Sequence, residues 1–344
     1  MTKMYFSADS DWVALATEIG FPSPTNDVPP RDQPIEPAEM DFRACREYQD
    51  ESDAQWEKSK FVDAAGYDSK LISVTSRDGT GISVKVSCPN LSRLDGRSLS
   101  LPVLFVTHGG GYVSGTHASE EAWLLRPLYN SFDLIIISVE YRLGPENKFP
   151  VWIEDSWDVL DQLLHHSDVF VSGLAATCDL EKLILAGSSA GGGISAALSQ
   201  ICRDQRVRIF GVVLNVPMVC DYRHFPSGTS DSYLDCNQDF MGSAELVTCW
   251  NTLLPSVSAG TDPRVSPLLG KMDSLPPHLI FIAGRDPLRD EGIAYAQKLD
   301  AAKVPTQCHI YSGVPHNFAH YETLQATKKF SDDIVSGFRD CFMC

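Results

Sequence analysis

The sequence has 344 residues, of which 43% are hydrophobic, and its formal net charge is −17. This length allows a large core, and the acidic charge is spread along the chain, which disfavours binding to nucleic acid or to anionic membranes. No run of eighteen apolar residues occurs, so we expect no membrane span.

The N-terminus, MTKMYFSADSDW, contains no apolar signal-peptide core, so we expect a cytoplasmic protein whose ten cysteines stay reduced. The nearest approach to a C-x₂-C metal pair is Cys341 and Cys344 at the last residue. His165 and His166, and His320 four residues after His316, imitate metal spacing, but no third ligand accompanies them. We therefore expect no metal and no cofactor, while homodimerisation stays open.

Residues 1–65 combine helical patterns with irregular chain. A helix is expected over 10–19 and a charged amphipathic helix over 38–61, and between them prolines interrupt any continuous helix, at positions 22, 24, 29, 30, 34 and 37. We interpret this region as a helical cap segment rather than an independent domain.

Apolar strand patterns then alternate with helical patterns across residues 66–344. The expected strands are 71–75, 82–87, 101–107, 134–139, 183–186, 209–216, 279–283 and 307–311, and the expected helices lie near 120–130, 153–166, after 186, at 290–302 and at the C-terminus. The first two strands flank Arg77-Asp78-Gly79, which indicates a β-hairpin. This alternation predicts an α/β fold, with a mostly parallel sheet flanked by helices on both faces.

Residues 217–267 break the alternation, because they contain glycine, serine and proline but no clear strand. An insertion of this length between two core strands is a candidate lid.

The candidate nucleophile lies in Gly187-Ser188-Ser189-Ala190-Gly191, which follows the apolar strand 183–186 and precedes a small-residue helix. The G-x-S-x-G spacing places Ser189 at the apex of a sharp strand-to-helix turn, beside unpaired N–H groups at the start of the helix. A phosphate loop would need a Gly-Lys-Ser/Thr ending or the G-x-G-x-x-G spacing, and both are missing. Tight packing alone is the remaining alternative for this turn.

Partners for a serine nucleophile occur at three other strand ends. His108-Gly109-Gly110-Gly111-Tyr112 follows the strand 101–107, and its glycines free backbone N–H groups to form an oxyanion hole; a tight turn is the alternative. We expect His108 to be structural, because it precedes the hole. Asp286 follows the strand 279–283, and His316 follows the last strand.

The order Ser189, Asp286, His316 matches the order of the catalytic triad in α/β-hydrolases. A serine hydroxyl needs a base, and the base needs a carboxylate that fixes its tautomer. Asp290 and Glu291, at the start of the next helix, are expected to cap its N-terminus.

The sequence resembles the hormone-sensitive-lipase family of α/β-hydrolases from about residue 70 to the C-terminus. The resemblance is carried by HGGGY at 108–112, EYRLGPENKFP at 140–150, GSSAG at 187–191, DPRVSPL at 262–268, RDPLRDEG at 285–292 and PHNF at 315–318. It implies Ser189 as nucleophile, His316 as base and Asp286 as its orienting acid. It also implies an oxyanion hole made by the N–H groups of Gly110, Gly111 and Ala190.

Two positions depart from the family pattern, which usually has aspartate before the nucleophile and glycine after the histidine. Here these residues are Ser188 and Asn317. The departures indicate a specialised relative, similar to the fungal secondary-metabolism esterases of the family.

The first functional hypothesis is a serine carboxylesterase acting on an uncharged, hydrophobic small-molecule ester or lactone. The second keeps the acyl-enzyme but transfers the acyl group to a substrate hydroxyl, as an acyltransferase or lactonising enzyme does. The third is a non-catalytic small-molecule receptor, and His316 argues against it. Some aromatic residues of the cap and lid are expected to line the pocket, from the set Trp12, Phe21, Phe42, Trp56, Phe225, Tyr233, Phe240 and Trp250.

Overall fold

A computed structural model describes residues 3–22, 24, 26, 34–59, 61–97, 99–228, 230–236 and 241–343. Pro29, Pro30 and Phe240, for which expectations were formed above, lie outside these residues.

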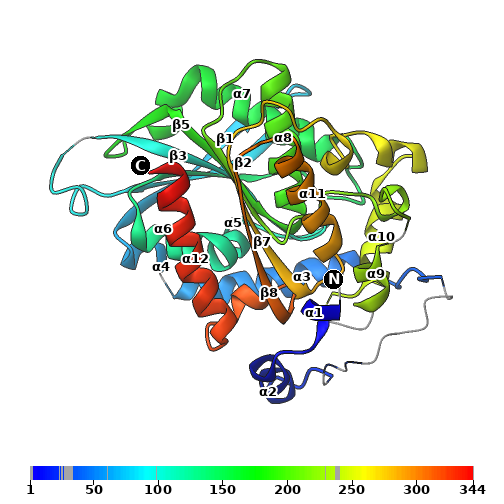
Figure 1. The fold of residues 1–344 in the computed structure, drawn as a ribbon. Coiled ribbons are helices and arrows are strands. Elements are labelled where there is room, and N and C mark those ends of the chain that lie inside the picture. Colours follow the sequence, from blue (N-terminus) through cyan, green and yellow to red (C-terminus); the bar gives the residue numbers. More distant parts are fainter. Residues whose placement is uncertain are drawn as a thin grey trace.

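Eight strands form a single sheet in the order β1-β2-β4-β3-β5-β6-β7-β8 (Figure 1). Strand β2 is antiparallel to both of its neighbours, β1 and β4, and the other pairs are parallel. The predicted α/β fold and the predicted hairpin are thus confirmed. The strands are β1 (Tyr67–Thr75), β2 (Gly81–Pro89), β3 (Ser100–Thr107), β4 (Ile135–Glu140), β5 (Thr177–Ser188), β6 (Gly211–Asn215), β7 (His278–Arg285) and β8 (Thr306–Pro315).

Helices connect the strands and cover both faces of the sheet. The α-helices are α1 (Lys3–Phe6), α2 (Ser10–Glu18), α3 (Phe42–Lys58), α4 (Phe61–Ala64), α5 (His117–Glu120), α6 (Arg126–Ser131), α7 (Val151–Val171), α8 (Ser189–Asp204), α9 (Asp231–Asp235), α10 (Ser243–Leu253), α11 (Arg289–Ala301) and α12 (Gln325–Phe342). The shorter π and 3₁₀ turns are η1 (Glu121–Leu125), η2 (Tyr222–His224), η3 (Val257–Thr261), η4 (Pro267–Leu269) and η5 (Phe318–His320). In the described part of the chain, no helix combines the length and the apolarity that crossing a membrane requires.

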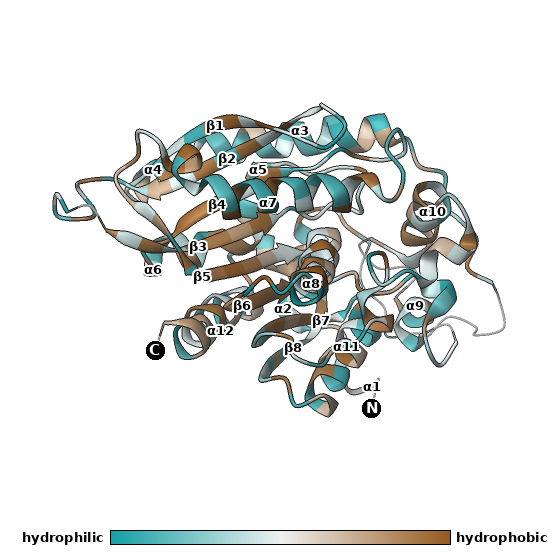
Figure 2. Ribbon diagram, turned by 90° about the horizontal axis from the view of Figure 1, so that it is seen from above, coloured by the Kyte–Doolittle hydropathy of each residue, from teal (hydrophilic) through white to brown (hydrophobic). Residues whose placement is uncertain are grey.

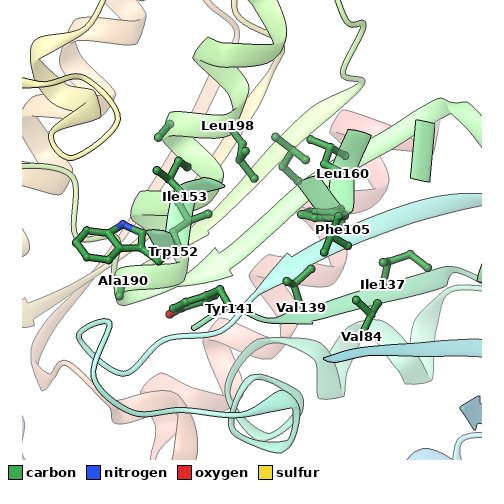
Figure 3. Packing of buried hydrophobic residues seen from close by; sticks show 14 of the residues in the cluster. Val84, Phe105, Ile137, Val139, Tyr141, Trp152, Ile153, Leu160, Ala190 and Leu198 are labelled. Atoms are coloured by element: carbon green, nitrogen blue, oxygen red, sulfur yellow. The ribbon is translucent and has the colours of Figure 1, made fainter. Parts of the chain in front are cut away.

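Alternating side chains of the strands divide the core into layers, since neighbouring residues of a strand face opposite sides. Phe105 packs in the cluster that contains Trp152 and Leu160 of α7, and this layer includes α8 (Figure 3). Its neighbour Leu104 packs in the cluster on the other face, with α6 and α12. Figure 2 shows the central strands β3, β4 and β5 as predominantly hydrophobic, in keeping with burial on both faces.

Two local expectations are wrong. Helix α7 does not end at His166 but continues to Val171 across a kink, where His166 has φ −139° and ψ 42°. Asp290 and Glu291 lie in the first turn of α11 but cap none of its N–H groups: Asp290 accepts from the N–H of Ser232, and Glu291 accepts from those of Val219 and Cys220. Both carboxylates therefore attach residues of the 217–267 segment to α11.

Helix α3 belongs to the N-terminal segment and lies across the carboxyl ends of the strands (Figure 1). Polar contacts hold it there. Arg46 donates from Nε to the carbonyl of Val113 at 2.8 Å and pairs with Glu146 at 2.7 Å, and Asp53 accepts a hydrogen bond from the hydroxyl of Thr116. Asp53 is the buried residue of α3, and Phe42 at the start of the helix packs against the core, so polar contacts carry much of the docking.

Candidate active site

Ser189 lies at the junction of β5 and α8 with φ +53°, in the left-handed region of backbone space. A non-glycine residue in that region is strained, as the predicted nucleophile turn requires. Glycine is needed close by, because a Cβ on Gly191 would overlap the carbonyl oxygen of Thr107 on β3. The hydroxyl of Thr107 donates to the carbonyl of Gly191 at 2.8 Å and fastens the turn to the neighbouring strand.

The structure brings His316 and Asp286 together at the ends of β8 and β7. His316 donates from Nδ1 to Oδ2 of Asp286 at 2.7 Å, as expected, and both side chains are buried. The N–H of Leu288 donates to the other carboxylate oxygen of Asp286 at 2.8 Å. The edge of the His316 ring meets Trp123, with ring centroids 5.2 Å apart. This bonding fixes the tautomer of His316 and leaves Nε2 as the acceptor.

Nε2 of His316 has no hydrogen-bond partner among the described residues, and no hydrogen bond joins it to Oγ of Ser189. Both residues line one cavity. Contacts between a base and its serine can tighten when substrate binds, so this geometry is compatible with His316 as the base.

The glycine loop after β3 adopts conformations that suit glycine, with φ +116° at Gly110 and +60° at Gly111. Gly110 lines the same cavity as Ser189. Ala190 is the second residue of α8, where backbone N–H groups lack partners within the helix. Gly110 thus shares the cavity of Ser189, and Ala190 directly follows Ser189, so an oxyanion hole at this turn stays a prediction.

Neighbouring aromatic residues and hydrogen bonds hold the glycine loop in place. The ring of Tyr112 stacks on Trp152, with centroids 4.7 Å apart, and the hydroxyl of Tyr141 donates to the carbonyl of His108 at 2.7 Å. Burial lowers the pKa of His108 to about 4, so its ring is neutral at pH 7. Its Nδ1 donates to the carbonyl of Gly109, which agrees with the structural role expected for this histidine.

The cavity has a volume of about 560 Å³, within the range of small-molecule sites. It is bounded on one side by α3 and on the other by η1, α6 and the segment after β8. Its lining residues are Tyr48, Gln49, Ser52, Gln55, Trp56, Ser59, Gly109, Gly110, Ser119, Ala122, Trp123, Arg126, Ser189, Met241, His316, Asn317, His320, Tyr321 and Glu322.

Trp56 is the one member of the expected aromatic set that lines this cavity, within the described residues. Tyr233 and Trp250 are buried in the core, Phe42 packs against that core, and Phe225 lines a different cavity. The remaining described aromatics, Trp12 and Phe21, pack against each other, with ring centroids 5.9 Å apart. Some members of the set were expected to line the pocket: Trp56 does, whereas most of the other described members anchor their segments to the core.

Glu120 is a candidate site residue that sequence reasoning missed. Its side chain is fully buried behind the nucleophile turn. Oε1 accepts from the hydroxyl of Ser188 at 2.6 Å, and Oε2 accepts from the N–H of Gly109 at 3.2 Å. The amide of Asn215 also donates to the Ser188 hydroxyl, at 3.1 Å. Glu120 therefore connects the glycine loop directly to the residue before the nucleophile.

Burial raises the pKa of Glu120 to about 8, so its carboxyl group is mainly protonated at pH 7. A neutral carboxyl avoids placing a negative charge beside the site where an oxyanion would form. One sequence feature could have indicated this residue. The resemblance leads one to expect aspartate at position 188, where this chain has serine, and here the carboxyl group comes from Glu120 of α5 instead.

Comparison with known proteins identifies the family. A family model described as the alpha/beta hydrolase fold matches residues 104–320, more than half of the chain. The chain is 31% identical over 282 residues to an AB hydrolase superfamily protein of Schizosaccharomyces pombe, covering 78% of each. It is 30% identical over 276 residues to an ethyl acetate hydrolase of Pseudomonas putida, covering 78% of this chain and 82% of the relative. The chain belongs to the α/β-hydrolase family, and the predicted carboxylesterase-like hydrolase is confirmed at this level.

Solved structures give the same result. An esterase of Pyrobaculum calidifontis superposes with a TM-score of 0.75 at 26% identity, covering 90% of this chain and 95% of the esterase. A vibralactone cyclase superposes with a TM-score of 0.81 at 24% identity, covering 98% and 96%, and this likeness shows the fold.

Glu120→Ala is expected to lower kcat for 4-nitrophenyl butyrate about tenfold or more, with a smaller change in KM, because a displaced oxyanion donor acts in the transition state. Glu120→Gln should stay close to wild type at pH 7, since an amide resembles the protonated carboxyl group. Steady-state kinetics at pH 7 measure both. Equal losses in the two variants would contradict a positioning role for the neutral carboxyl.

The raised pKa of Glu120 also predicts a pH dependence of stability. Between the pKa of an unfolded glutamate and about 8, the unfolded state ionises while the folded state stays protonated, so stability decreases as pH rises. Wild type should therefore lose stability relative to Glu120→Gln from about pH 5 to pH 8, and the difference should level off above pH 8. Thermal unfolding at several pH values tests this, and a constant difference would contradict it.

Proposed function

We propose that this protein is a serine carboxylic-ester hydrolase that works through an acyl-enzyme. The observation that supports this most directly is the arrangement of Ser189, at a strained strand-to-helix turn, with the hydrogen-bonded pair His316 and Asp286 at the same cavity. A non-catalytic receptor does not need a hydrogen-bonded histidine and aspartate beside a serine, so this pair favours an enzyme over the receptor hypothesis.

In the proposed reaction Oγ of Ser189 attacks the ester carbonyl while Nε2 of His316 takes the hydroxyl proton. Asp286 stabilises the resulting imidazolium through the 2.7 Å hydrogen bond to Nδ1. The N–H groups of Gly110, Gly111 and Ala190 stabilise the oxyanion of the tetrahedral intermediate. The C–O bond to the alcohol then breaks, and the alcohol leaves with the proton from His316. Water, deprotonated by His316, repeats these steps on the acyl-enzyme and releases the acid and free Ser189.

Water is the proposed acyl acceptor, because the cavity reaches solvent through exposed residues of α3. Tyr48 is 72% exposed, and Ser52, Gln55 and Ser59 are exposed as well. A lactonising or acyl-transferring enzyme must exclude water from the acyl-enzyme. The lactonising or acyl-transfer hypothesis therefore requires a conformation in which the opening of the cavity is closed. Product analysis with a hydroxy-acid ester distinguishes the two reactions, because hydrolysis gives the free acid and cyclisation gives the lactone.

Ser189→Ala is expected to reduce turnover of 4-nitrophenyl acetate and butyrate by at least about a thousandfold, because it removes the proposed nucleophile. Ser199→Ala, a buried serine later in α8, is the matched control and should keep most of the activity. Mass spectrometry of wild type quenched during turnover should find the acyl group on the peptide that contains Ser189. Substantial turnover by Ser189→Ala, or an acyl group on Ser188, would contradict the assignment.

We also propose that residues 1–65 act as the cap of the site and 217–267 as its lid, on a core of 66–344. For the cap, support comes from α3, which forms one wall of the cavity and is docked by Arg46 on the loop after β3. For the lid, support comes from Met241, which lines the cavity.

Arg46→Ala is expected to raise KM for the larger ester 1-naphthyl butyrate several-fold and to change KM for 4-nitrophenyl acetate little, because only the larger ester reaches α3. Arg43→Ala is the control on the same helix, since Arg43 is exposed and pairs only with Glu47 among the described residues. Steady-state kinetics on both esters measure the difference. Equal changes on both substrates would show that α3 serves stability instead.

A further inference from the structure

We infer that the substrate of this site is a neutral, oxygen-rich ester, with hydroxyl groups on the part of the molecule that does not react. This inference deepens the proposed esterase function and rests on it. It replaces the hydrophobic ester expected from the sequence, and it follows from the chemistry of the cavity walls.

The first wall is one face of α3. Residues 48, 49, 52, 55, 56 and 59 lie on the same side of a helix, because they recur at intervals of three and four. A helix that covers an apolar substrate should present an apolar stripe there. This stripe instead carries hydroxyl and amide groups beside two aromatic rings, those of Tyr48 and Trp56.

Solvent exposure does not account for all of the polar lining. Asn317 and His320 are only partly exposed, yet they line the cavity. Asn317 adjoins the base His316, and its amide donates to the hydroxyl of Tyr321 at 3.1 Å. This asparagine stands where the resemblance leads one to expect glycine, so the chain has placed an amide beside the reacting atoms.

Apolar side chains, among them Trp123 and Met241, share the cavity with these polar groups, and its charged side chains are paired. Arg126 pairs with Glu322, and its guanidinium group lies 5.7 Å from the centre of the Trp56 ring. Burial, followed by the charge of Arg126, lowers the pKa of His320 to about 4, so this ring is neutral at pH 7. Amides, hydroxyls and a neutral imidazole can each donate or accept, which matches hydroxyl groups rather than a carboxylate or an ammonium group.

A matched pair of esters measures this preference. In 1-monobutyrin the alcohol part carries two hydroxyl groups, and in 2-methylbutyl butyrate methyl groups take their places, so shape and acyl group are preserved. An apolar pocket favours the second ester, because burial of methyl groups is favourable. A pocket that binds the hydroxyls favours the first, because unpaired polar groups of the wall oppose the methyl analogue.

The experiment measures kcat/KM of wild type for both esters and the affinity of Ser189→Ala for both by calorimetry. Wild type is expected to prefer 1-monobutyrin at least tenfold in kcat/KM, with Ser189→Ala showing the same order in affinity. The double variant Ser52→Ala/Gln55→Met, which keeps the length of both side chains nearly constant, should reduce this ratio at least threefold. Gln297→Met, an exposed glutamine on α11 outside the cavity, should leave the ratio unchanged.

Each result decides the proposal. A preference of wild type or of Ser189→Ala for 2-methylbutyl butyrate overturns it, and so does an unchanged ratio in the double variant. If wild type turns over neither ester nor 4-nitrophenyl acetate, the esterase function fails; the calorimetric ratio then still shows whether the cavity selects hydroxylated esters. Selective binding and turnover of 1-monobutyrin support both the esterase function and the preference for hydroxylated esters.

Discussion

The close approach of β3 and β5 at their carboxyl ends is the constraint on which the site depends. The two strands are parallel neighbours, and the turn after β5 lies so near β3 that a side chain at Gly191 would overlap the carbonyl of Thr107. At this turn Ser189 adopts a left-handed conformation, and α8 begins. The proposed nucleophile and oxyanion donors therefore come from one junction, and the ends of the adjacent strands β7 and β8 carry the proposed acid and base.

A buried carboxyl group stabilises this junction on the side away from the cavity. Glu120 accepts hydrogen bonds from both sides of the junction, Gly109 and Ser188. An ionised carboxylate in this position would oppose the negative charge of an oxyanion across a medium of low dielectric constant. Burial resolves the conflict, because it raises the pKa of Glu120 and keeps the group neutral. The arrangement holds both backbone segments without an electrostatic cost to the proposed chemistry.

The sheet and the residues at its carboxyl edge could be predicted because their signals are local. Strands such as 101–107 are continuous apolar runs, and Ser189, Asp286 and His316 each directly follow a strand. Glu120 could not be found in this way, because its partners are 11 and 68 residues away and no spacing rule links them. Asp290 and Glu291 were misinterpreted for the same reason: their position in the helix suggested caps, whereas their partners lie in the 217–267 segment.

The residues that line the cavity were hard to predict, because α3 does not dock mainly through an apolar face. Hydrophobic periodicity assumes that a helix docks through its apolar face, so the aromatic residues of the cap and lid were expected at the pocket. Helix α3 docks through the polar contacts of Arg46 and Asp53 together with Phe42 at its start, so it needs no long apolar docking stripe. The face turned to the cavity can then be selected for the ligand alone. Where polar contacts dock a helix, the residues on its other face need not match the core, and their chemistry indicates what that face covers.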